Sequence, residues 1–304
     1  MHPEYKEKII NELKENGFVA IGFNKAEMVD SAFAAKYNSW LQSGMHANMS
    51  WLERNNEKRF DPTLLHSGTK TIITAIFPWP ETKFDSDELK IAAYAHGFDY
   101  HQFLREKAKP VLEFIAKVNP NHKPRFFTDS APIADRYWAQ KAGLGFIGKN
   151  SNLIHPEYGS RFFIAHIFTA LSEESENKSL MQACGNCTRC INACPTNAII
   201  ENGVIDSNRC ISYWNIEAKE EVPMEIVAKK AGWIFGCDIC QMVCPYNKTE
   251  ILFETSLEMK GNWQSPKSSD EWFSFDERLF EIQFGNTPLA RAGLKKIFEN
   301  LKDV

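Results

Sequence analysis

The feature that most constrains this chain is a closely spaced run of cysteines that ends in a proline. It reads Cys184-Gly-Asn-Cys187-Thr-Arg-Cys190-Ile-Asn-Ala-Cys194-Pro195. Proteins use this spacing to bind [4Fe-4S] clusters, with the first three thiolates on one cluster and the last on a second. The fixed φ of Pro195 suits the first position of a helix, so we expect a short helix to begin there. The run therefore predicts two clusters and a partner run elsewhere.

The partner run follows later in the chain, as Cys237-x2-Cys240-x3-Cys244-Pro245. It is one cysteine short, but the chain contains 8 cysteines and the remaining one, Cys210, lies between the two runs. If the last cysteine of each run crosses over, the cysteines divide into two equal sets with none left over. The first set is then Cys184, Cys187, Cys190 and Cys244, and the second set is Cys194, Cys210, Cys237 and Cys240.

Zinc sites and disulfides are the alternative uses of such cysteines. Zinc ribbons contain Cys-x2-Cys pairs but not the longer run that ends in Cys-Pro. A disulfide framework is typical of small secreted chains, and a chain of 304 residues can bury a sufficient core without disulfides. We therefore favour two [4Fe-4S] clusters.

The composition is that of an ordinary folded protein. With 304 residues, of which 43% are hydrophobic and 24% charged, the chain has the length of about two domains. The N-terminal stretch is a charged amphipathic helix without an apolar signal core or twin arginine, and no apolar stretch is long enough to span a bilayer. We therefore expect a cytoplasmic protein without membrane association. The net charge of −4 argues against a wholly basic, nucleic-acid-binding surface but leaves room for a local basic patch.

Strands and helices alternate through the part of the chain that precedes the cysteines. A β-branched run at residues 71–77 predicts a buried strand, and apolar spacing over residues 100–118 predicts a helix that a central proline should kink or split. The alternation indicates an α/β or α+β fold. We expect a substrate domain at 1–170, a cluster domain at 171–250 and a C-terminal helical segment at 251–304 that packs back on the core.

Asp129 is a candidate catalytic residue on the basis of the sequence pattern alone. It ends a predicted strand, and strand ends in α/β sheets face the ligand crevice, where a carboxyl group can donate a proton. The alternative is that Asp129 caps a helix beginning at Pro132, a common duty of aspartate, and both readings remain open. Tyr100 and His101 at a helix start could bind a ligand, although a lone histidine there is more often structural. The sequence contains no dinucleotide-binding glycine motif after a strand and no P-loop.

Several stretches of the chain, in order, resemble motifs of the epoxyqueuosine reductase family. They are FTDSAPIADRYWAQKAGLGFIGKNS, CGNCTRCINACPTNAI, RCISYWNIE, GCDICQMVCPYN and TPLARAGLKKIFENL, and the likeness extends over nearly the whole chain. The resemblance implies a nitroreductase-like cobalamin-binding domain followed by a ferredoxin-like domain with two [4Fe-4S] clusters, a fold related to that of the reductive dehalogenases. It also implies the reaction. Epoxyqueuosine at the wobble position of tRNA would be reduced at its epoxide, which gives queuosine. The reductant would be Co(I) cobalamin that receives its electrons from the clusters.

The resemblance implies roles for individual residues as well. Asp129 would be the proton donor and contact cobalamin, and Tyr100 and His101 would line the substrate pocket. The stretch Asp99-Tyr-His101 is similar to a D-x-H-x-x-G motif whose histidine ligates cobalt. Because Leu104 replaces the glycine, we expect base-off cobalamin without a histidine–cobalt bond. Further cofactor contacts would be Lys149, Asn150, Ser151, Ser212 and Asp238.

The partners implied by the resemblance are a tRNA and an electron donor. The tRNA would have a GUN anticodon carrying epoxyqueuosine, and its wobble base would leave the anticodon loop to enter the pocket. The donor would be an external protein of the flavodoxin or ferredoxin type, and the chain is expected to act as a monomer. Residues that could face tRNA, each with the alternative of a solvated surface charge, are Glu217, Lys141, Arg161, Arg189, Arg209, Lys229 and Lys230.

Two other functions stay open at this point. A reductive dehalogenase would share the cofactors and the fold, although such enzymes usually carry a twin-arginine export signal, which this sequence lacks. A plain ferredoxin-type electron carrier would explain the cysteines but would leave residues 1–170 without a use.

Overall fold

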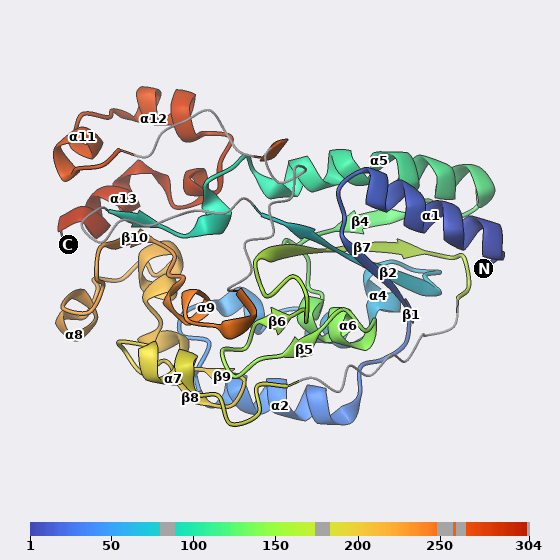
Figure 1. Ribbon diagram of the computed structural model, residues 1–304, viewed down its shortest axis with the longest axis horizontal. Helices are drawn as coiled ribbons and strands as arrows, with labels where there is room; N and C mark the ends of the chain where they lie inside the picture. Colours follow the sequence, from blue (N-terminus) through green and yellow to red (C-terminus); the bar gives the residue numbers. More distant parts are fainter. Residues whose placement is uncertain (80–88, 174–182, 248–257, 260–265, 303–304) are drawn as a thin grey trace.

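A four-stranded antiparallel sheet forms the centre of the first part of the chain (Figure 1). Strand β2 pairs with β7 along its whole length. The strands, in the order β1-β2-β7-β4 across the sheet, are β1 (Ala20–Lys25), β2 (Thr71–Pro78), β7 (Phe162–Thr169) and β4 (Arg125–Phe127). The computed structural model describes residues 1–79, 89–173, 183–247, 258–259 and 266–302.

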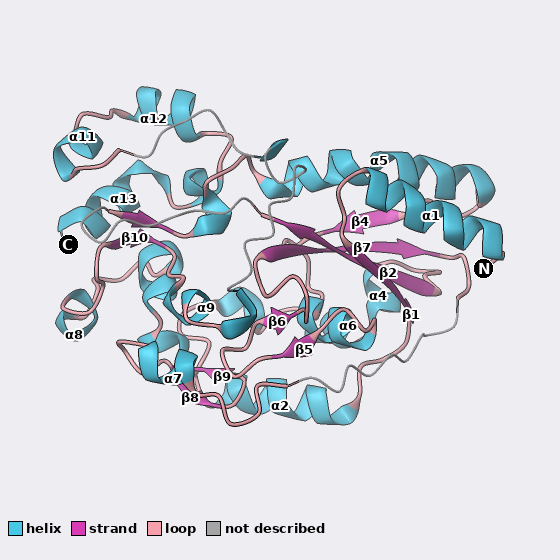
Figure 2. Cartoon of the chain, viewed as in Figure 1, coloured by secondary structure: helices cyan, strands magenta, loops and turns pink. Residues whose placement is uncertain are grey.

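Helices cover both faces of this sheet (Figure 2). Every residue of β2 is buried, and its side chains alternate between the two faces. Ile73 packs with residues of α1 (Pro3–Glu15) and α5 (Tyr100–Val118), whereas Ile72 packs with residues of α6 (Asp135–Lys141). The β-branched sequence of β2 suits this burial on both sides.

The mixture of helices and strands agrees with the expected fold class, but the pairing removes one argument made from the sequence. All neighbouring strands of the sheet are antiparallel, so the crevice that forms at the carboxyl ends of parallel strands is not a feature of this sheet. Local geometry must therefore place Asp129. Of the kink or split expected at Pro110, the split is wrong, because α5 continues past the proline as one helix. Apolar residues on both sides of the proline, such as Leu104 and Ile115, pack in one core.

The cysteine region consists of short helices and short strands. Helices α7 and α9 pack against each other, and each contains cysteines. The prediction that a helix begins at Pro195 is wrong, because the helical turn forms before the proline and Pro195 itself lies in a turn. The elements are α7 (Arg189–Ala193), β8 (Ile199–Glu201), β9 (Val204–Ile205), α8 (Met224–Val227), β10 (Trp233–Phe235) and α9 (Ile239–Met242).

The cysteine region is joined to the first part of the chain by a short parallel ladder, in which β3 (Lys90–Ile91) pairs with β10. The helices of the C-terminal segment pack over this ladder through side chains that include Trp272 and Phe284. These helices are α11 (Ser269–Phe273), α12 (Glu277–Phe284) and α13 (Gly293–Lys302). The boundaries expected for the three parts of the chain stay predictions.

The remaining elements are short or peripheral. Among the described residues, no helix has the length and apolar character needed to cross a membrane. Helix α2 approaches the cysteine region, where Trp40 Nε1 donates to the Ile205 carbonyl at 2.7 Å. The short or peripheral elements are α2 (Ser31–Gln42), α3 (Asn56–Phe60), α4 (Pro62–Leu65), β5 (Phe146–Ile147) and β6 (Leu153–Ile154).

Candidate functional site

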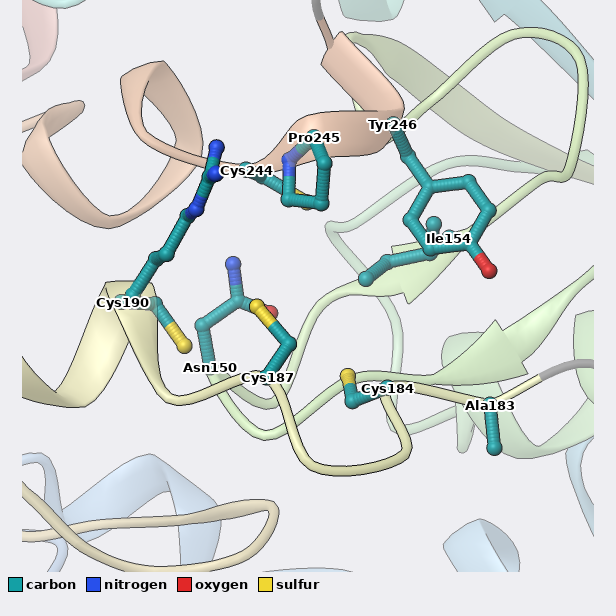
Figure 3. A pocket seen from close by; sticks show the side chains of 10 residues that line it. Asn150, Ile154, Ala183, Cys184, Cys187, Cys190, Cys244, Pro245 and Tyr246 are labelled. Carbon is teal, nitrogen blue, oxygen red and sulfur yellow. The ribbon is translucent and has the colours of Figure 1, made fainter.

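The first set of cysteines lines one cavity of about 320 Å³ (Figure 3). Cys184, Cys187 and Cys190 come from the loop leading into α7 and from α7 itself. Cys244 reaches the same cavity from the residues just after α9. The structure thus brings together the residues that the sequence assigned to one set, including the one that is distant in sequence.

The second set of cysteines also lies together. Burial raises the pKa of Cys237 to about 12, and the neighbouring thiols of Cys210 and Cys194 add to the rise. Burial likewise raises the pKa of Cys240 well above its usual range, with Cys237 and Cys210 contributing. The Cys190 thiol of the first set also raises the pKa of Cys240, so the two sets adjoin. A thiol gives up its proton when it binds a metal, and the charge of the metal then compensates for the burial.

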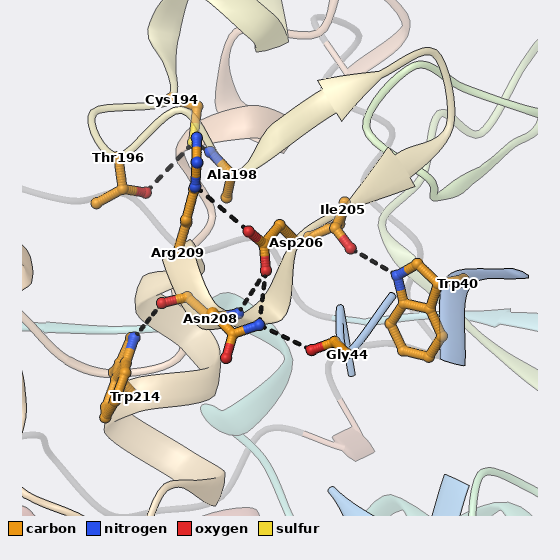
Figure 4. A network of polar contacts seen from close by, with 10 residues as sticks. All are labelled: Trp40, Gly44, Cys194, Thr196, Ala198, Ile205, Asp206, Asn208, Arg209 and Trp214. Carbon is orange, nitrogen blue, oxygen red and sulfur yellow. Dashed lines mark hydrogen bonds and ion pairs between the residues drawn. The ribbon is translucent and has the colours of Figure 1, made fainter. Parts of the chain in front are cut away.

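Backbone N–H groups are directed at the sulfurs of both sets. The Ala198 nitrogen lies 3.3 Å from Cys194 Sγ, and Figure 4 shows this loop together with the Thr196 hydroxyl, 3.6 Å from the same sulfur. In the first set, the Lys149 nitrogen lies 3.4 Å from Cys184 Sγ. Hydrogen bonds to cysteine sulfur tune the reduction potential of a bound cluster, so these donors are suited to a redox role.

A polar network anchors the segment that leads to Cys210 (Figure 4). Asp206 accepts the Asn208 N–H at 3.0 Å and forms an ion pair with Arg209 at 3.3 Å. The Asn208 amide in turn donates to the carbonyl of Gly44 in the first part of the chain at 2.9 Å. Arg209, a predicted tRNA contact, is therefore engaged in holding this segment.

Asp129 makes a hydrogen bond rather than a helix cap. The Tyr100 hydroxyl donates to Asp129 Oδ2 over 2.6 Å. The following helix begins only at Asp135, after an Ala134 that lacks a side-chain cap, so the capping alternative is wrong. Asp129 has a φ of 56°, in the left-handed region, which turns the chain immediately after β4. Its side chain is 57% exposed and can meet a substrate.

His101 lies between two carboxylates, and a stack of rings supports it. His101 Nδ1 is 2.8 Å from Asp99 Oδ1, and His101 Nε2 is 3.9 Å from Asp129 Oδ2. Asp99 also caps α5 by accepting the His101 backbone N–H. The ring of Tyr100 stacks on His101 and on Phe163, with centroids 4.1 and 4.3 Å apart. These contacts fix the two side chains that approach Asp129.

Arg291, in the C-terminal segment, lies within electrostatic reach of the Asp129 carboxylate. Arg291 Nη2 pairs with Glu217 Oε1 at 2.7 Å. Burial raises the pKa of Tyr100 far above its usual range, the Asp129 charge raises it further, and the Arg291 charge opposes the rise. Tyr100 therefore remains a protonated donor. Glu217 was predicted from the sequence as a tRNA contact, whereas Arg291 was not predicted, although it lies in the TPLARAG motif.

The consecutive cobalamin contacts expected from the sequence lie in two different places. Asn150 lines the cavity of the first cysteine set, and Lys149 Nζ donates to a backbone carbonyl of the cysteine loop at 2.9 Å. Ser151 Oγ instead accepts from Arg136 at 2.9 Å. Arg136 is within electrostatic reach of Asp129, so Ser151 is the member of the three that lies toward the acid.

Ser212 and Asp238 lie beside the second cysteine set. The Ser212 backbone N–H is directed at the thiol of Cys210. Asp238 is buried and accepts the Ala93 N–H at 2.6 Å. Burial raises the pKa of Asp238 to about 6, while the Ala93 N–H and the charge of Arg161 oppose the rise. Arg161, another predicted tRNA contact, thus lies near Asp238.

The remaining basic candidates differ in exposure. Lys141 Nζ pairs with Asp30 Oδ2 at 3.2 Å, and Arg189 lines the cavity of the first cysteine set. Lys229 is exposed. Lys230 is only 1% exposed, so the expectation that it holds a phosphate is wrong, because a buried ammonium group cannot reach a nucleic acid.

Two family models match this chain. Residues 183–247 match the model of a 4Fe-4S double cluster binding domain, which confirms the prediction of two [4Fe-4S] clusters. Residues 59–130 match the model described as epoxyqueuosine reductase QueG, DUF1730. The second match ends at the residue that follows Asp129.

Relatives resemble the chain over nearly its whole length. An epoxyqueuosine reductase from Leadbetterella byssophila is 37% identical over 299 residues, which are 98% of this chain and 97% of the relative. A solved epoxyqueuosine reductase with an epoxyqueuosine-modified tRNA-Tyr stem loop matches with a TM-score of 0.84 at 29% identity, covering 99% of this chain and 80% of that one. The Bacillus subtilis enzyme, solved with its catalytic aspartate loop swung out of the active site, matches with a TM-score of 0.83 at the same identity and coverage. Both the resemblance and the expected fold are confirmed, and the chain belongs to the epoxyqueuosine reductase family of oxidoreductases.

Proposed function

We propose that this chain reduces the epoxide of epoxyqueuosine at the wobble position of tRNA, with Asp129 as the proton donor. One observation carries the assignment of the acid. The Tyr100 hydroxyl holds Asp129 by a hydrogen bond of 2.6 Å, while the carboxylate side chain remains 57% exposed. A general acid must be both oriented and within reach of the group it protonates, and Asp129 meets both conditions.

Each cysteine set holds one cluster in this proposal. The first set lies in a loop where Ala183, Gly185 and Arg189 are exposed, so an external donor can approach it. The second set lies beside Asp238, which contacts the Ala93 N–H in the segment leading to the active site. The cysteines of the two sets would hold clusters that supply single-electron transfer between this exposed loop and the region of Asp129.

Cobalamin, when bound near Asp129, supplies a strong reductant for the epoxide. The chemistry of His101 fits a base-off corrinoid, because its ring nitrogens face carboxylates at 2.8 and 3.9 Å and the ring is engaged within the protein. Asp129 itself would contact the corrinoid on its substrate side. The other contacts proposed from the resemblance are Lys149, Asn150, Ser151, Ser212 and Asp238.

The proton chemistry follows from the groups around Asp129. Conversion of an epoxide to an alkene takes up two electrons and two protons and releases water. Asp129 gives its proton to the epoxide oxygen as the C–O bond opens, so that no unprotonated alkoxide has to leave. The Tyr100 hydroxyl then donates to the carboxylate that remains and stabilises it. Solvent supplies the second proton, because the Asp129 side chain is 57% exposed and the neighbouring His101 side chain is 33% exposed.

The substrate in this proposal is a tRNA with a GUN anticodon that carries epoxyqueuosine, and the epoxyqueuosine-modified tRNA-Tyr stem loop held by a solved relative supports a tRNA substrate. Its modified base must leave the anticodon loop to reach Asp129. In the Bacillus subtilis relative the catalytic aspartate loop can swing out of the site, and here Asp129 lies in the turn between β4 and α6. Such a turn can open without disturbing the sheet. The residues proposed to face tRNA remain Glu217, Lys141, Arg161, Arg189, Arg209 and Lys229.

The electron donor, oligomeric state and location complete the proposal. A donor of the flavodoxin or ferredoxin type fits an exposed loop around the first cysteine set, because electron transfer needs a close but transient contact. We propose a monomer in the cytoplasm, where thiols remain reduced and clusters can assemble.

Turnover of a defined RNA tests the proposal. Protein with reconstituted clusters and added cobalamin is mixed with a chemical reductant and an anticodon stem loop carrying epoxyqueuosine. Mass spectrometry of the digested nucleosides should show loss of one oxygen atom. A corrinoid absorbance band in the purified protein would exclude a plain electron carrier, and a halogenated arene serves as the control substrate for dehalogenation. No conversion of the RNA by fully loaded protein would contradict the proposal.

A further inference from the structure

A tight turn in the first part of the chain reaches into the cysteine region. It spans residues 148–152, between β5 and β6, and we call it the Gly148 turn. The Gly148 N–H donates to the Asn152 carbonyl at 2.8 Å, and the Ser151 N–H donates to the Gly148 carbonyl at 2.9 Å. A Cβ atom at Gly148 would lie 2.8 Å from Asn150 Oδ1, so glycine at this position allows Asn150 to fold inward.

Two groups of the Gly148 turn approach the first cysteine set. The Lys149 nitrogen donates to Cys184 Sγ at 3.4 Å, and Lys149 Nζ donates to the Gly185 carbonyl at 2.9 Å, which holds the cysteine loop against the turn. Asn150 is only 2% exposed, and its side chain points into the cavity that the first set lines (Figure 3). A buried amide in a cavity lined by thiols is a donor placed near the position that cluster sulfurs would occupy.

Asn150 also touches the second cysteine set. Its Nδ2 lies 3.4 Å from the backbone carbonyl of Cys240, and its Oδ1 accepts the Asn152 N–H at 3.3 Å. Cys240 lies on α9, which packs against the α7 helix of the first set. One buried amide therefore contacts the surroundings of both sets.

We propose that Asn150 is a positioning residue between the two clusters, and that its amide, together with the Lys149 N–H, raises the reduction potential of the cluster on the first set. Reduction adds negative charge to a cluster, and N–H donors favour the more negative state. The proposal rests on the cluster ligation proposed above. This role of Asn150 is additional to the cobalamin contact that the resemblance implies.

Two variants separate the amide donor from the shape of the side chain. Asn150→Leu removes the donor at similar volume, and Asn150→Asp keeps the shape but replaces the donor with a carboxylate. Each protein is reconstituted with iron and sulfide, without cobalamin, and titrated potentiometrically with detection by electron paramagnetic resonance. Loss of the first cluster's signal in Cys187→Ser assigns the two reduction steps.

The expected result is a lower potential for the first cluster. At the potential that half-reduces this cluster in the unchanged protein, the ratio of reduced to oxidised cluster should fall about tenfold in Asn150→Leu, the size of effect expected for one hydrogen bond to a charged group. This corresponds to about 59 mV for a one-electron couple. Asn150→Asp should lower the ratio further, because a carboxylate opposes the added negative charge.

Asn152→Asp is the matched control, because it makes the same charge change in the same turn at a residue outside the lining of the cavity. It should leave the ratio nearly unchanged. Unchanged potentials in both Asn150 variants at full iron content would overturn the proposal. So would a loss of corrinoid binding, measured separately with added cobalamin, without any shift in potential. That result would make Asn150 a cobalamin contact only.

Loss of iron is also informative. If Asn150→Leu fails to assemble clusters, the isosteric Asn150→Asp carries the test. If both variants lose iron and circular dichroism shows that they are unfolded, Asn150 is a folding residue and the proposal is wrong. The titration uses no tRNA. A failure of epoxyqueuosine turnover would therefore contradict the proposed function without affecting the measured reduction potentials.

Discussion

The cysteine region and the Asp129 site are assembled in opposite ways. Three cysteines of the first set and two of the second are a few residues apart, so local loops bring them together, and Cys194, Cys210 and Cys244 must come from elsewhere. The partners of Asp129 lie on separate elements, with Tyr100 at the start of α5 and Arg291 in the C-terminal segment. Cofactor binding is thus encoded in local spacing, whereas orientation of the acid depends on the tertiary fold.

This contrast predicts different consequences of mutation. A change in the cysteine region should remove a whole cofactor. A change near Asp129 should leave the cofactors and the fold in place and slow the chemistry. The following changes test that difference, beginning with the largest expected effect.

Cys210→Ala should abolish turnover. Cys210 is the isolated cysteine of the second set, and loss of one thiolate leaves a cluster without a ligand. We expect the protein to contain half of the normal iron, measured by iron and sulfide analysis, and to show no conversion of epoxyqueuosine. Ser212→Ala is the control in the same segment and should retain all of its iron. A full iron content in Cys210→Ala would remove this residue from the ligands.

Asp129→Asn should lower the turnover number by about 10² to 10⁴, the usual contribution of a general acid. The amide keeps the shape of the carboxyl group but cannot supply the proton. Iron content, corrinoid absorbance and melting temperature should match those of the unchanged protein. Ser130→Ala, at the exposed neighbouring residue, should retain its activity. Normal turnover in Asp129→Asn would mean that another group protonates the oxygen.

Tyr100→Phe should reduce the turnover number by about 10-fold to 100-fold, because one hydrogen bond to a charged group is worth about 1.5–3 kcal/mol. The aromatic stack on Phe163 should survive, so the KM for the stem loop should change little. Tyr37→Phe is the matched control, since the Tyr37 hydroxyl donates to the Leu52 carbonyl instead. Equal turnover numbers for the two variants would show that Tyr100 does not act through its hydroxyl group.

Thr287→Ala should have the smallest effect, a loss of about 1 kcal/mol in the free energy of unfolding, as expected for a helix N-cap. Thr287 Oγ1 accepts the Leu289 N–H at 3.3 Å and so caps the short turn that ends at Arg291. Chemical denaturation measures the loss, and Thr287→Ser should restore the stability. Turnover should fall slightly at normal iron content. If iron is lost first, the cysteine region and the Asp129 site depend on each other for stability.

Helices and cysteine sets could be predicted from the sequence where the residues that define them follow a regular local spacing. The expected bounds of α5 agree with the structure, because its apolar residues repeat at helical spacing and Asp99 caps its start. The division of the cysteines followed from their number and spacing alone. The helix expected at Pro132 begins at Asp135 instead, since a proline permits a helix start without requiring one.

Features that depend on contacts between residues far apart in the chain could not be predicted from the sequence, for a physical reason. The antiparallel order of the sheet depends on which distant strands pair, and the side-chain pattern of a fully buried strand is the same in either direction. Arg291 was missed because nothing in its local spacing connects it with Asp129. The inward position of Asn150 was missed for a similar reason, because a cysteine loop from another part of the chain completes its surroundings.

The parallel ladder between β3 and β10 has a consequence for the order in which the protein is made. The segment that leads to Tyr100 starts at β3, which pairs with Trp233–Phe235, and the Asp99 N–H donates to the Asn286 carbonyl at 2.9 Å. A ribosome delivers Trp233–Phe235 shortly before the last three cysteines, and it delivers Asn286 only after all the cysteines have been synthesised. The acid site therefore cannot be completed on the nascent chain before every cluster ligand is available, and iron supply can be coupled to the final step of folding.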